Sequence, residues 1–241
     1  FKYLAKDGRV FLNGDDSHLS AVTAVNGSSP VFYGINKGNN TYYSENINNM
    51  GIKGISCTLC TPTNRLEVTI PAIGTYMVAN ALVAVAIGEY LGMEPAQIKK
   101  GVESYKTVGS RANVINTGKI KIIDDCYNAN PTSVRASLDT LSNLDGRKVA
   151  ILGDMKELGS EELKLHFDTG VYAKSKGIGT VITVGELAKE LAKGADGKAF
   201  DTIEDAKPEI LKTIKSGDVV LVKASHSMQF ENIVEFLKQN F

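Results

Sequence analysis

The sequence has no tryptophan, three cysteines and no excess of charge of either sign. Three cysteines do not make a disulfide framework in a chain of 241 residues, so we expect a reducing, cytoplasmic environment. The 27 basic and 27 acidic residues balance, and basic runs do not exceed a pair such as Lys99 and Lys100. This pattern argues against nucleic acid and anionic membranes as partners. The longest apolar stretch, residues 78–87, is shorter than the ~20 residues of a membrane span.

Three sequence signatures are also missing. The first eight residues lack a basic start followed by an apolar core, so they predict no secretory signal and resemble a chain entered partway. The sequence contains no G-x-x-x-x-G-K-[ST] segment, the P-loop that holds nucleotide phosphates. Cys57 and Cys60 have the spacing of a zinc pair, but no second Cys/His pair accompanies them. Buried or edge thiols are therefore the favoured interpretation of these cysteines.

The second half of the chain, residues 109–241, alternates between strand and helix patterns. Short apolar runs typical of buried parallel strands are separated by helical patterns, and this order predicts a Rossmann-like, doubly wound α/β sheet. The strand candidates are residues 120–123, 149–152, 180–184, a short segment near Phe200, and 219–222. The last predicted helix has the i, i+3, i+4, i+7 stripe of a core-facing helix at Phe230, Ile233, Val234 and Leu237.

The first part of the chain, residues 1–108, has fewer candidates for parallel strands. Two short ones come first, then a β-rich stretch with Asn and Gly turn residues, then two helices. Two or three parallel strands are too few for a self-sufficient α/β sheet, so we expect a truncated domain that continues upstream. The elements are predicted at residues 10–12, 31–33, 42–70 and 94–102, with Val78, Ala81, Leu82 and Val85 on one face of the first helix.

The densest group of chemically active side chains lies at residues 124–133, which read Asp-Asp-Cys-Tyr-Asn-Ala-Asn-Pro-Thr-Ser. This segment follows a predicted strand, and Pro131 is suited to open a helix. Ligands of open α/β sheets bind at the carboxyl ends of the strands. Asn, Pro and Ser also make turns and caps. Two adjacent acids and two Asn beside a Tyr exceed what a cap needs, so we interpret the segment as functional.

The segment from Asp125 to Ser133 resembles the D-S-Y-N-A-N-P-x-S segment of the Mur ligases that add D-alanyl-D-alanine. Other segments match the same family in the family's order, which makes an accidental likeness improbable. The resemblance implies the C-terminal portion of a Mur ligase central ATP-binding α/β domain over residues 1–108. It implies a C-terminal Rossmann-like ligase domain over residues 109–241. The matching segments are Asn13-Gly-Asp-Asp, Gly74 to Leu82, Gly109-Ser-Arg111, Gly153-Asp-Met-Lys-Glu-Leu-Gly159 and Lys223 to Met228.

The resemblance also implies roles for individual side chains. It places Asn80 against adenine, Asp125 on the ribose hydroxyls and Lys223 on the carboxylate of incoming D-alanyl-D-alanine. The ATP- and adenosine-binding candidates are Tyr76, Asn80, Arg111, Asp125 and Tyr127, and the substrate-binding candidates are Asn128, Asn130, Asp154, Lys223, Ser225 and Met228.

Plain structural roles compete with several of these assignments. Asn80 also suits helix packing, Arg111 an interdomain tie, and Lys223 a solvated strand end, while His166 on a helix is more typical of a packed residue than of a catalytic one. The chain also departs from the family at positions that bear on these roles. Tyr76 stands where the family has His, and the family pattern K-G-S-R-x-M has Ala224 and His226 in place of its Gly and Arg.

The activity implied by the resemblance is ATP-dependent ligation of D-alanyl-D-alanine to UDP-N-acetylmuramoyl-tripeptide through an acyl phosphate, with release of ADP and phosphate. This reaction serves peptidoglycan synthesis, and through it cell wall biogenesis, cell shape, the cell cycle and cell division. The family's P-loop, carbamylated Lys and Mg²⁺ ligands precede the segment at Asn13. We therefore expect no catalytic or metal-binding residue in this chain, which we expect to be monomeric and inactive alone.

Two other interpretations stay open. A ligase of the same superfamily that extends folate or a polymer with amino acids is one, although the Tyr-Asn-Ala-Asn-Pro string at 127–131 argues against it. A Rossmann-like binding or regulatory module without a reaction of its own is the other, because the P-loop is missing.

Overall fold

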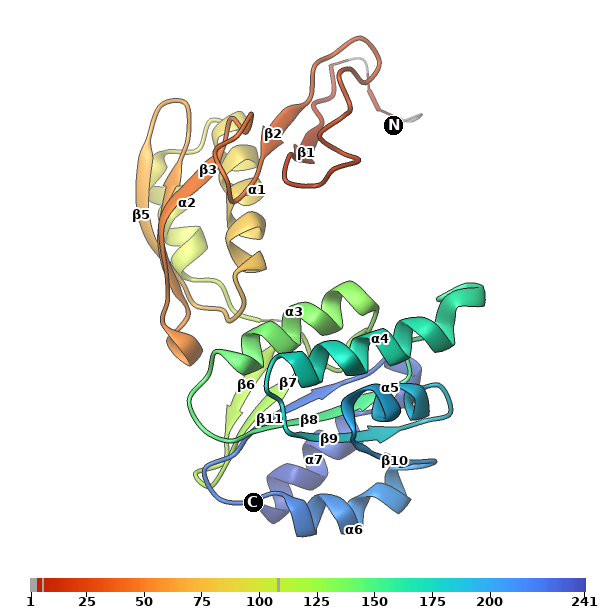
Figure 1. The fold of residues 1–241 in the computed structure, drawn as a ribbon. Helices are drawn as coiled ribbons and strands as arrows, with labels where there is room; N and C mark the ends of the chain where they lie inside the picture. Colours follow the sequence, from red (N-terminus) through yellow and green to blue (C-terminus); the bar gives the residue numbers. More distant parts are fainter. Residues whose placement is uncertain (1–3, 6, 108) are drawn as a thin grey trace. The chain divides into compact units, whose positions relative to one another are not determined.

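The structure is a computed structural model that describes residues 4, 5, 7–107 and 109–241. The chain folds into two compact units, Phe1–Lys106 and Thr107–Phe241, each drawn in Figure 1. The boundary predicted from the sequence falls next to this division, although Val108 itself lies outside the described residues. Within the described part of the chain, no helix is long and apolar enough to cross a membrane.

The first unit contains a short parallel pair of strands and an antiparallel sheet. The pair β1 and β2 is parallel, as predicted, and the β-rich stretch forms a sheet in the order β3-β4-β5. Both predicted helices are present. The elements are β1 (Phe11–Asn13), β2 (Val31–Tyr33), β3 (Tyr43–Asn49), η1 (Gly51–Lys53), β4 (Ile55–Cys60), β5 (Arg65–Ile70), α1 (Tyr76–Tyr90) and α2 (Pro95–Glu103).

The core of the first unit lies between this sheet and its helices. Strand β5 alternates between exposed and buried residues, so one face packs inward. Helix α2 begins after Glu94, whose backbone and side chain form a capping box with Gln97, and has Pro95 at its first position. The core includes Ile55, Leu59, Ile70, Val78, Leu82 and Val85.

The two cysteines with zinc-like spacing lie on β4 and are buried. Burial, with a smaller effect of Cys60, raises the pKa of Cys57 to about 11. A thiol with such a high pKa is protonated near neutral pH and is a poor metal ligand. The interpretation as buried thiols is confirmed.

The second unit is an α/β sheet in the order β10-β9-β8-β11-β7-β6. The neighbouring pairs from β10 to β7 are parallel, as predicted. Strand β6 pairs antiparallel with β7 at the edge, and its short, partly buried Asn-Val-Ile-Asn segment was not predicted. The strands are β6 (Asn113–Asn116), β7 (Lys121–Asp124), β8 (Lys148–Gly153), β9 (Thr180–Val184), β10 (Lys198–Phe200) and β11 (Val219–Lys223).

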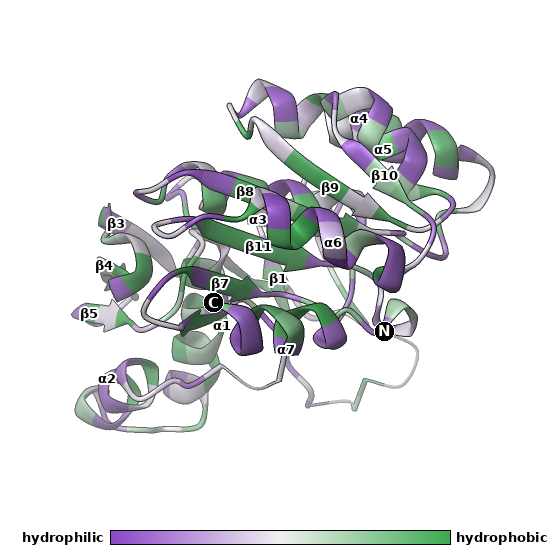
Figure 2. Cartoon of the chain, turned by 90° about the horizontal axis from the view of Figure 1, so that it is seen from below, coloured by the Kyte–Doolittle hydropathy of each residue, from purple (hydrophilic) through white to green (hydrophobic). Residues whose placement is uncertain are grey.

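Helices cover both faces of this sheet. Figure 1 shows α3, α4 and α5 on one face and α6 and α7 on the other. Figure 2 colours the central strands β8 and β11 as mainly hydrophobic, as expected for strands buried on both faces. The helices are α3 (Pro131–Ser142), α4 (Glu162–Ser175) after the short η2 (Gly159–Glu161), α5 (Ala188–Ala195), α6 (Ile203–Thr213) and α7 (Glu231–Asn240) after η3 (His226–Met228).

The predicted apolar stripe of the last helix is confirmed. Phe230 and Leu237 are fully buried and belong to the core on the α6 and α7 side of the sheet. The loop after β11 leads to α7 on this face, whereas the loops after β7 and β8 lead to α3 and α4 on the opposite face. The loops therefore diverge around β11 at the carboxyl edge, which is where open α/β sheets form their binding crevices.

Candidate functional site

Three loops meet at the carboxyl edge of the second unit's sheet. Strands β8, β11 and β7 are adjacent and parallel, so the segments that follow Gly153, Lys223 and Asp124 lie at one edge. These loops enclose a pocket of about 620 Å³. It is lined by Tyr127, Asn128, Ala129, Asn130, Lys156, Glu157, Leu158, Ser225, His226 and Ser227.

Beneath this pocket, Asp125 and Lys223 form a buried ion pair. The Lys223 Nζ lies 2.7 Å from Asp125 Oδ2 and donates a second hydrogen bond of 2.8 Å to the carbonyl of Asn128. The two side chains are 12% and 3% exposed. Lys223 is therefore neither solvated nor directly open to the pocket, and its charge is compensated within the protein.

Both oxygens of the Asp125 carboxylate also accept hydrogen bonds from other parts of the second unit. Its Oδ1 accepts the backbone N–H of Ala112 at 3.0 Å, and its Oδ2 accepts the hydroxyl of Ser137 on α3 at 2.7 Å. Three segments of the chain, around Ala112, Ser137 and Lys223, thus converge on one carboxylate. The prediction that Asp125 binds ribose stays a prediction, and the structure adds that this residue fixes the loop carrying Arg111.

A second buried carboxylate, Asp154, holds the loop after β8. Its Oδ1 accepts the N–H of Ala188 at 2.8 Å, and its carbonyl accepts the N–H of Ser225 at 3.1 Å. Gly185 has φ +119°, and a Cβ atom there would lie 2.4 Å from Asp154 Oδ1. Glycine is required at that position because the carboxylate lies against its backbone. Asp154 therefore links the loops after β8, β9 and β11.

His166 supports the same loop from α4. It is fully buried, its Nε2 accepts the N–H of Met155 at 2.9 Å, and its Nδ1 lies 2.7 Å from the carbonyl of Glu162. This pattern requires the neutral tautomer with its proton on Nδ1. His166 is thus a packed residue, in agreement with the structural interpretation of its sequence position.

The outer part of the site is an exposed stack of three side chains. The Arg111 guanidinium lies 3.8 Å from the centre of the Tyr127 ring, and the His226 ring centre lies 5.9 Å from it. Tyr127 is 49% exposed. Sequence reasoning selected Arg111 and Tyr127 separately. It did not predict that they stack, nor that His226 joins them.

The two Asn side chains of the motif shape the pocket wall. Asn130 caps α3 by accepting the N–H of Ser133 at 2.8 Å, so it has the capping role as well as a place in the lining. Asn128 Oδ1 accepts the N–H of Ala129 at 2.8 Å. Both side chains use their oxygen internally, and their amide N–H groups are the donors left for a ligand.

The loop after β11 is closely packed on its inner side. Ala224 is fully buried, and a Cβ atom at Gly153 would lie 2.7 Å from its methyl group, so the glycine on β8 makes room for the alanine. Met228 packs against the core and is not in the pocket lining. Burial, with a smaller contribution from Asp124, raises the pKa of the Cys126 thiol far above its usual range, which excludes it as a nucleophile.

The adenosine candidates of the first unit lie on α1. Asn80 is exposed and lines an apolar pocket of about 370 Å³ together with residues of α2. Tyr76 is partly exposed and is absent from that lining. The structure therefore places Asn80, but not Tyr76, beside a cavity suited to a flat apolar group such as a nucleobase.

Two charged residues of the pocket escaped sequence reasoning. Lys156 and Glu157 belong to the matched segment 153–159 but were not selected, because their positions alone gave no reason to prefer them to Asp154. Among the described residues, no group of three or more His, Cys, Asp and Glu side chains is arranged to hold a metal ion.

The fold of each unit is that of a Mur ligase domain, and comparison with known proteins agrees. Residues 110–226 match the family described as "Mur ligase, glutamate ligase domain", and residues 1–88 match the "Mur ligase middle domain". The chain belongs to the Mur ligase family.

Three known proteins illustrate this similarity. UDP-N-acetylmuramoyl-tripeptide–D-alanyl-D-alanine ligase of Escherichia coli is 31% identical over 100% of this chain and 54% of its own length. The crystal structure of MurF from Acinetobacter baumannii has a TM-score of 0.90 with 27% identity, covering 99% of this chain and 53% of that one. MurF ligase from Thermotoga maritima, solved in complex with ADP, has a TM-score of 0.84 with 23% identity, over 98% and 54%. The chain thus spans about half the length of these proteins.

Proposed function

We propose that this chain is the central and C-terminal part of a ligase that joins D-alanyl-D-alanine to UDP-N-acetylmuramoyl-tripeptide at the expense of ATP. The observation that carries the proposal is the pocket at the carboxyl edge of the second unit, enclosed by the loops after β7, β8 and β11. Its size and polar lining suit a small peptide. The reaction would serve peptidoglycan synthesis in the cytoplasm, with the enzyme acting as a monomer.

The domain assignment follows the same proposal. Residues 1–108 would be the end of the central ATPase domain, and residues 109–241 the ligase domain that receives the acceptor. Asn80 would contact adenine. The apolar cavity that Asn80 lines supports adenosine binding by the first unit. The phosphate-activating groups and the Mg²⁺ ligands would lie outside these 241 residues, which contain no P-loop.

The residues of the second unit would act by positioning. Arg111 and Tyr127 would contact ATP, with Asp125 reaching the ribose or holding the Arg111 loop in place. Asn128, Asn130 and Ser225 would line the acceptor site, and Asp154 and Met228, which are outside the pocket lining, would support it. A free α-amine has a pKa of about 8, so a sizeable fraction of the acceptor is neutral near physiological pH. Its attack on an acyl phosphate then depends on orientation and the exclusion of water more than on a strong base.

The experiment that tests the proposal compares this chain with the same chain extended upstream through its expected P-loop. Both are incubated with ATP, Mg²⁺, UDP-N-acetylmuramoyl-tripeptide and D-alanyl-D-alanine, and the UDP-linked pentapeptide is detected by mass spectrometry. Parallel reactions replace the acceptor with L-glutamate and the tripeptide with folate. Formation of pentapeptide by the extended protein alone is expected.

Each other outcome identifies a rival. Product from folate or with L-glutamate would favour a different ligase of the superfamily. No product with any pair would favour a binding or regulatory module. Pentapeptide formation by the chain of 241 residues would overturn the assignment of the phosphate-activating groups to an upstream segment.

A further inference from the structure

The charges of the acceptor pocket are unevenly distributed. Among its lining residues, all of which the structure describes, Lys156 is the one lysine or arginine. Lys223 lies below the pocket and compensates Asp125. Arg111 covers the Tyr127 ring. A ligand carboxylate that enters the pocket therefore meets one permanent cation, the ammonium of Lys156.

Hydrogen bonds fix the position of Lys156 but occupy only one of the N–H donors of its ammonium group. Its backbone N–H donates to the Ser225 hydroxyl at 2.9 Å, and its Nζ donates to Asp154 Oδ2 at 2.7 Å. The Lys156 side chain is 44% exposed, whereas that of Asp154 is 3% exposed. An ammonium has three N–H donors, so two remain for a ligand while the third is anchored to a buried carboxylate.

An acidic residue follows directly in the same wall. Glu157 lines the pocket, is exposed, and has φ +65°, a left-handed conformation that is uncommon for residues other than glycine. Within the described part of the chain its carboxylate makes no ion pair or hydrogen bond. The wall thus presents a cation and an anion side by side, with Ala129 and Leu158 as apolar neighbours. This combination complements a small zwitterionic peptide with methyl side chains.

We propose that Lys156 binds the carboxylate of the acceptor dipeptide and so determines acceptor specificity, in place of the buried Lys223 that the sequence resemblance selected. The inference rests on the proposed function, because it takes D-alanyl-D-alanine as the occupant of the pocket. His226 lines the same pocket, and Lys156 supplies a permanent positive charge to its wall.

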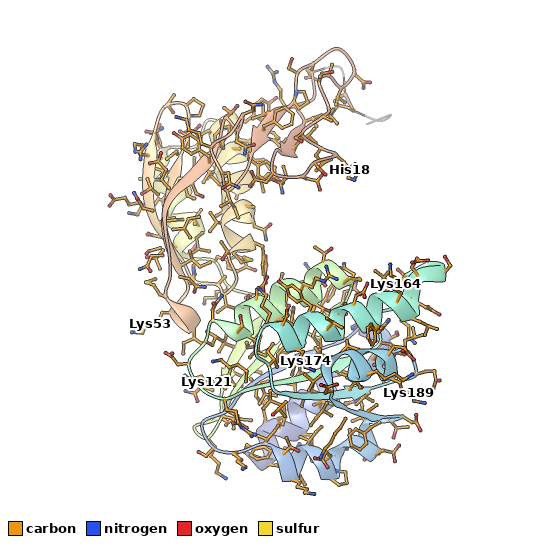
Figure 3. The ribbon with its side chains drawn as sticks, in the orientation of Figure 1. His18, Lys53, Lys121, Lys164, Lys174 and Lys189 are labelled. Atoms are coloured by element: carbon orange, nitrogen blue, oxygen red, sulfur yellow. The ribbon has the colours of Figure 1, made fainter. Side chains whose placement is uncertain are left out.

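The test measures binding to the chain of 241 residues by NMR titration of the ¹⁵N-labelled protein. The ligands are D-alanyl-D-alanine and D-alanyl-D-alaninamide, which lacks the carboxylate. Loss of a hydrogen bond to a charged group weakens binding on the order of 10- to 100-fold. We expect Lys156→Met to bind the dipeptide more weakly by that factor and to bind the amide almost as the wild type does. Lys156→Arg is expected to restore the affinity for the dipeptide. The matched control is Lys164→Met, an exposed lysine of α4 that is outside the pocket lining (Figure 3).

A second measurement needs no substitution. In wild-type protein with ¹³C-labelled lysine, the Cε resonance of Lys156 is expected to shift on addition of the dipeptide but not of the amide, while that of Lys223 shifts with neither. Wild-type binding that Lys156→Met leaves unchanged, or a shift at Lys223 alone, would overturn the inference and leave the proposed function standing. Failure of wild-type protein to bind the dipeptide would overturn the inference, and the pentapeptide assay of the extended protein then decides the proposed function separately.

Discussion

The carboxyl edge of the second unit has an inner part and an outer part that differ in how their polar groups are used. In the inner part, Asp125, Lys223, Asp154 and His166 are buried, and each is hydrogen-bonded to at least two partners. In the outer part, Arg111, Tyr127, Lys156, Glu157 and His226 are exposed.

This difference separates support from recognition. A buried charge that loses its partner is costly, so the inner residues are fixed in one arrangement. The outer residues keep donors and ring faces available for a ligand. The motifs at this sheet edge therefore include buried residues, such as Asp125 and Asp154, that position the neighbouring loops.

The largest effect is expected from breaking the inner ion pair. Lys223→Met would leave Asp125 buried beside Ser137 without a cation, which costs about 3–5 kcal/mol of unfolding free energy. Urea unfolding followed by far-ultraviolet circular dichroism measures the change. Lys121→Met, on the neighbouring strand β7 and labelled in Figure 3, is the control and should change stability by less than about 0.5 kcal/mol.

The double variant Asp125→Asn with Lys223→Met sharpens the test. It removes both charges together, so it should be more stable than Lys223→Met alone. Equal stability of the single and double variants would mean that the pair is solvated and that the inner part is not a compensated core.

A smaller effect is expected from His166. His166→Ala removes the acceptor of the Met155 N–H, and a buried donor left unpaired costs about 1–3 kcal/mol. His18→Ala is the matched control because His18 is exposed on the loop labelled in Figure 3, and it should be nearly neutral. A loss from His166→Ala no larger than that of the control would contradict the assigned support of the β8 loop.

The strands and helices of the second unit were largely predictable from the sequence. Buried parallel strands are short continuous apolar runs, and these differ clearly from the i, i+3, i+4, i+7 spacing of apolar residues in the helices. The strand β6 was missed because Asn113–Asn116 is short, polar at both ends and partly buried. The order of the sheet, with β11 between β7 and β8, depends on long-range pairing that local patterns do not contain.

The sequence indicated where the candidate site lies, but not which of its residues are buried supports and which are exposed to a ligand. The motif at 124–133 lies at the strand end where the structure forms a pocket, yet the same residue types suit a ligand or an internal partner. The pairing of Asp125 with Lys223 joins residues that are 98 positions apart. Likewise, Lys156 is a candidate ligand-binding residue because the fold brings it into one pocket with the loops after β7 and β11. Its sequence position alone does not indicate this.

The smallest effect on stability is expected in the outer stack. Tyr127→Leu removes the ring that both Arg111 and His226 contact, and an exposed cation–π contact contributes about 0.5–1 kcal/mol. The change in urea unfolding free energy should therefore be less than about 1 kcal/mol, and Tyr127→Phe, which keeps the ring face, should be closer to wild type. A loss of more than about 2 kcal/mol in Tyr127→Leu would place the stack with the supporting inner residues and remove the distinction drawn between the two parts of the edge.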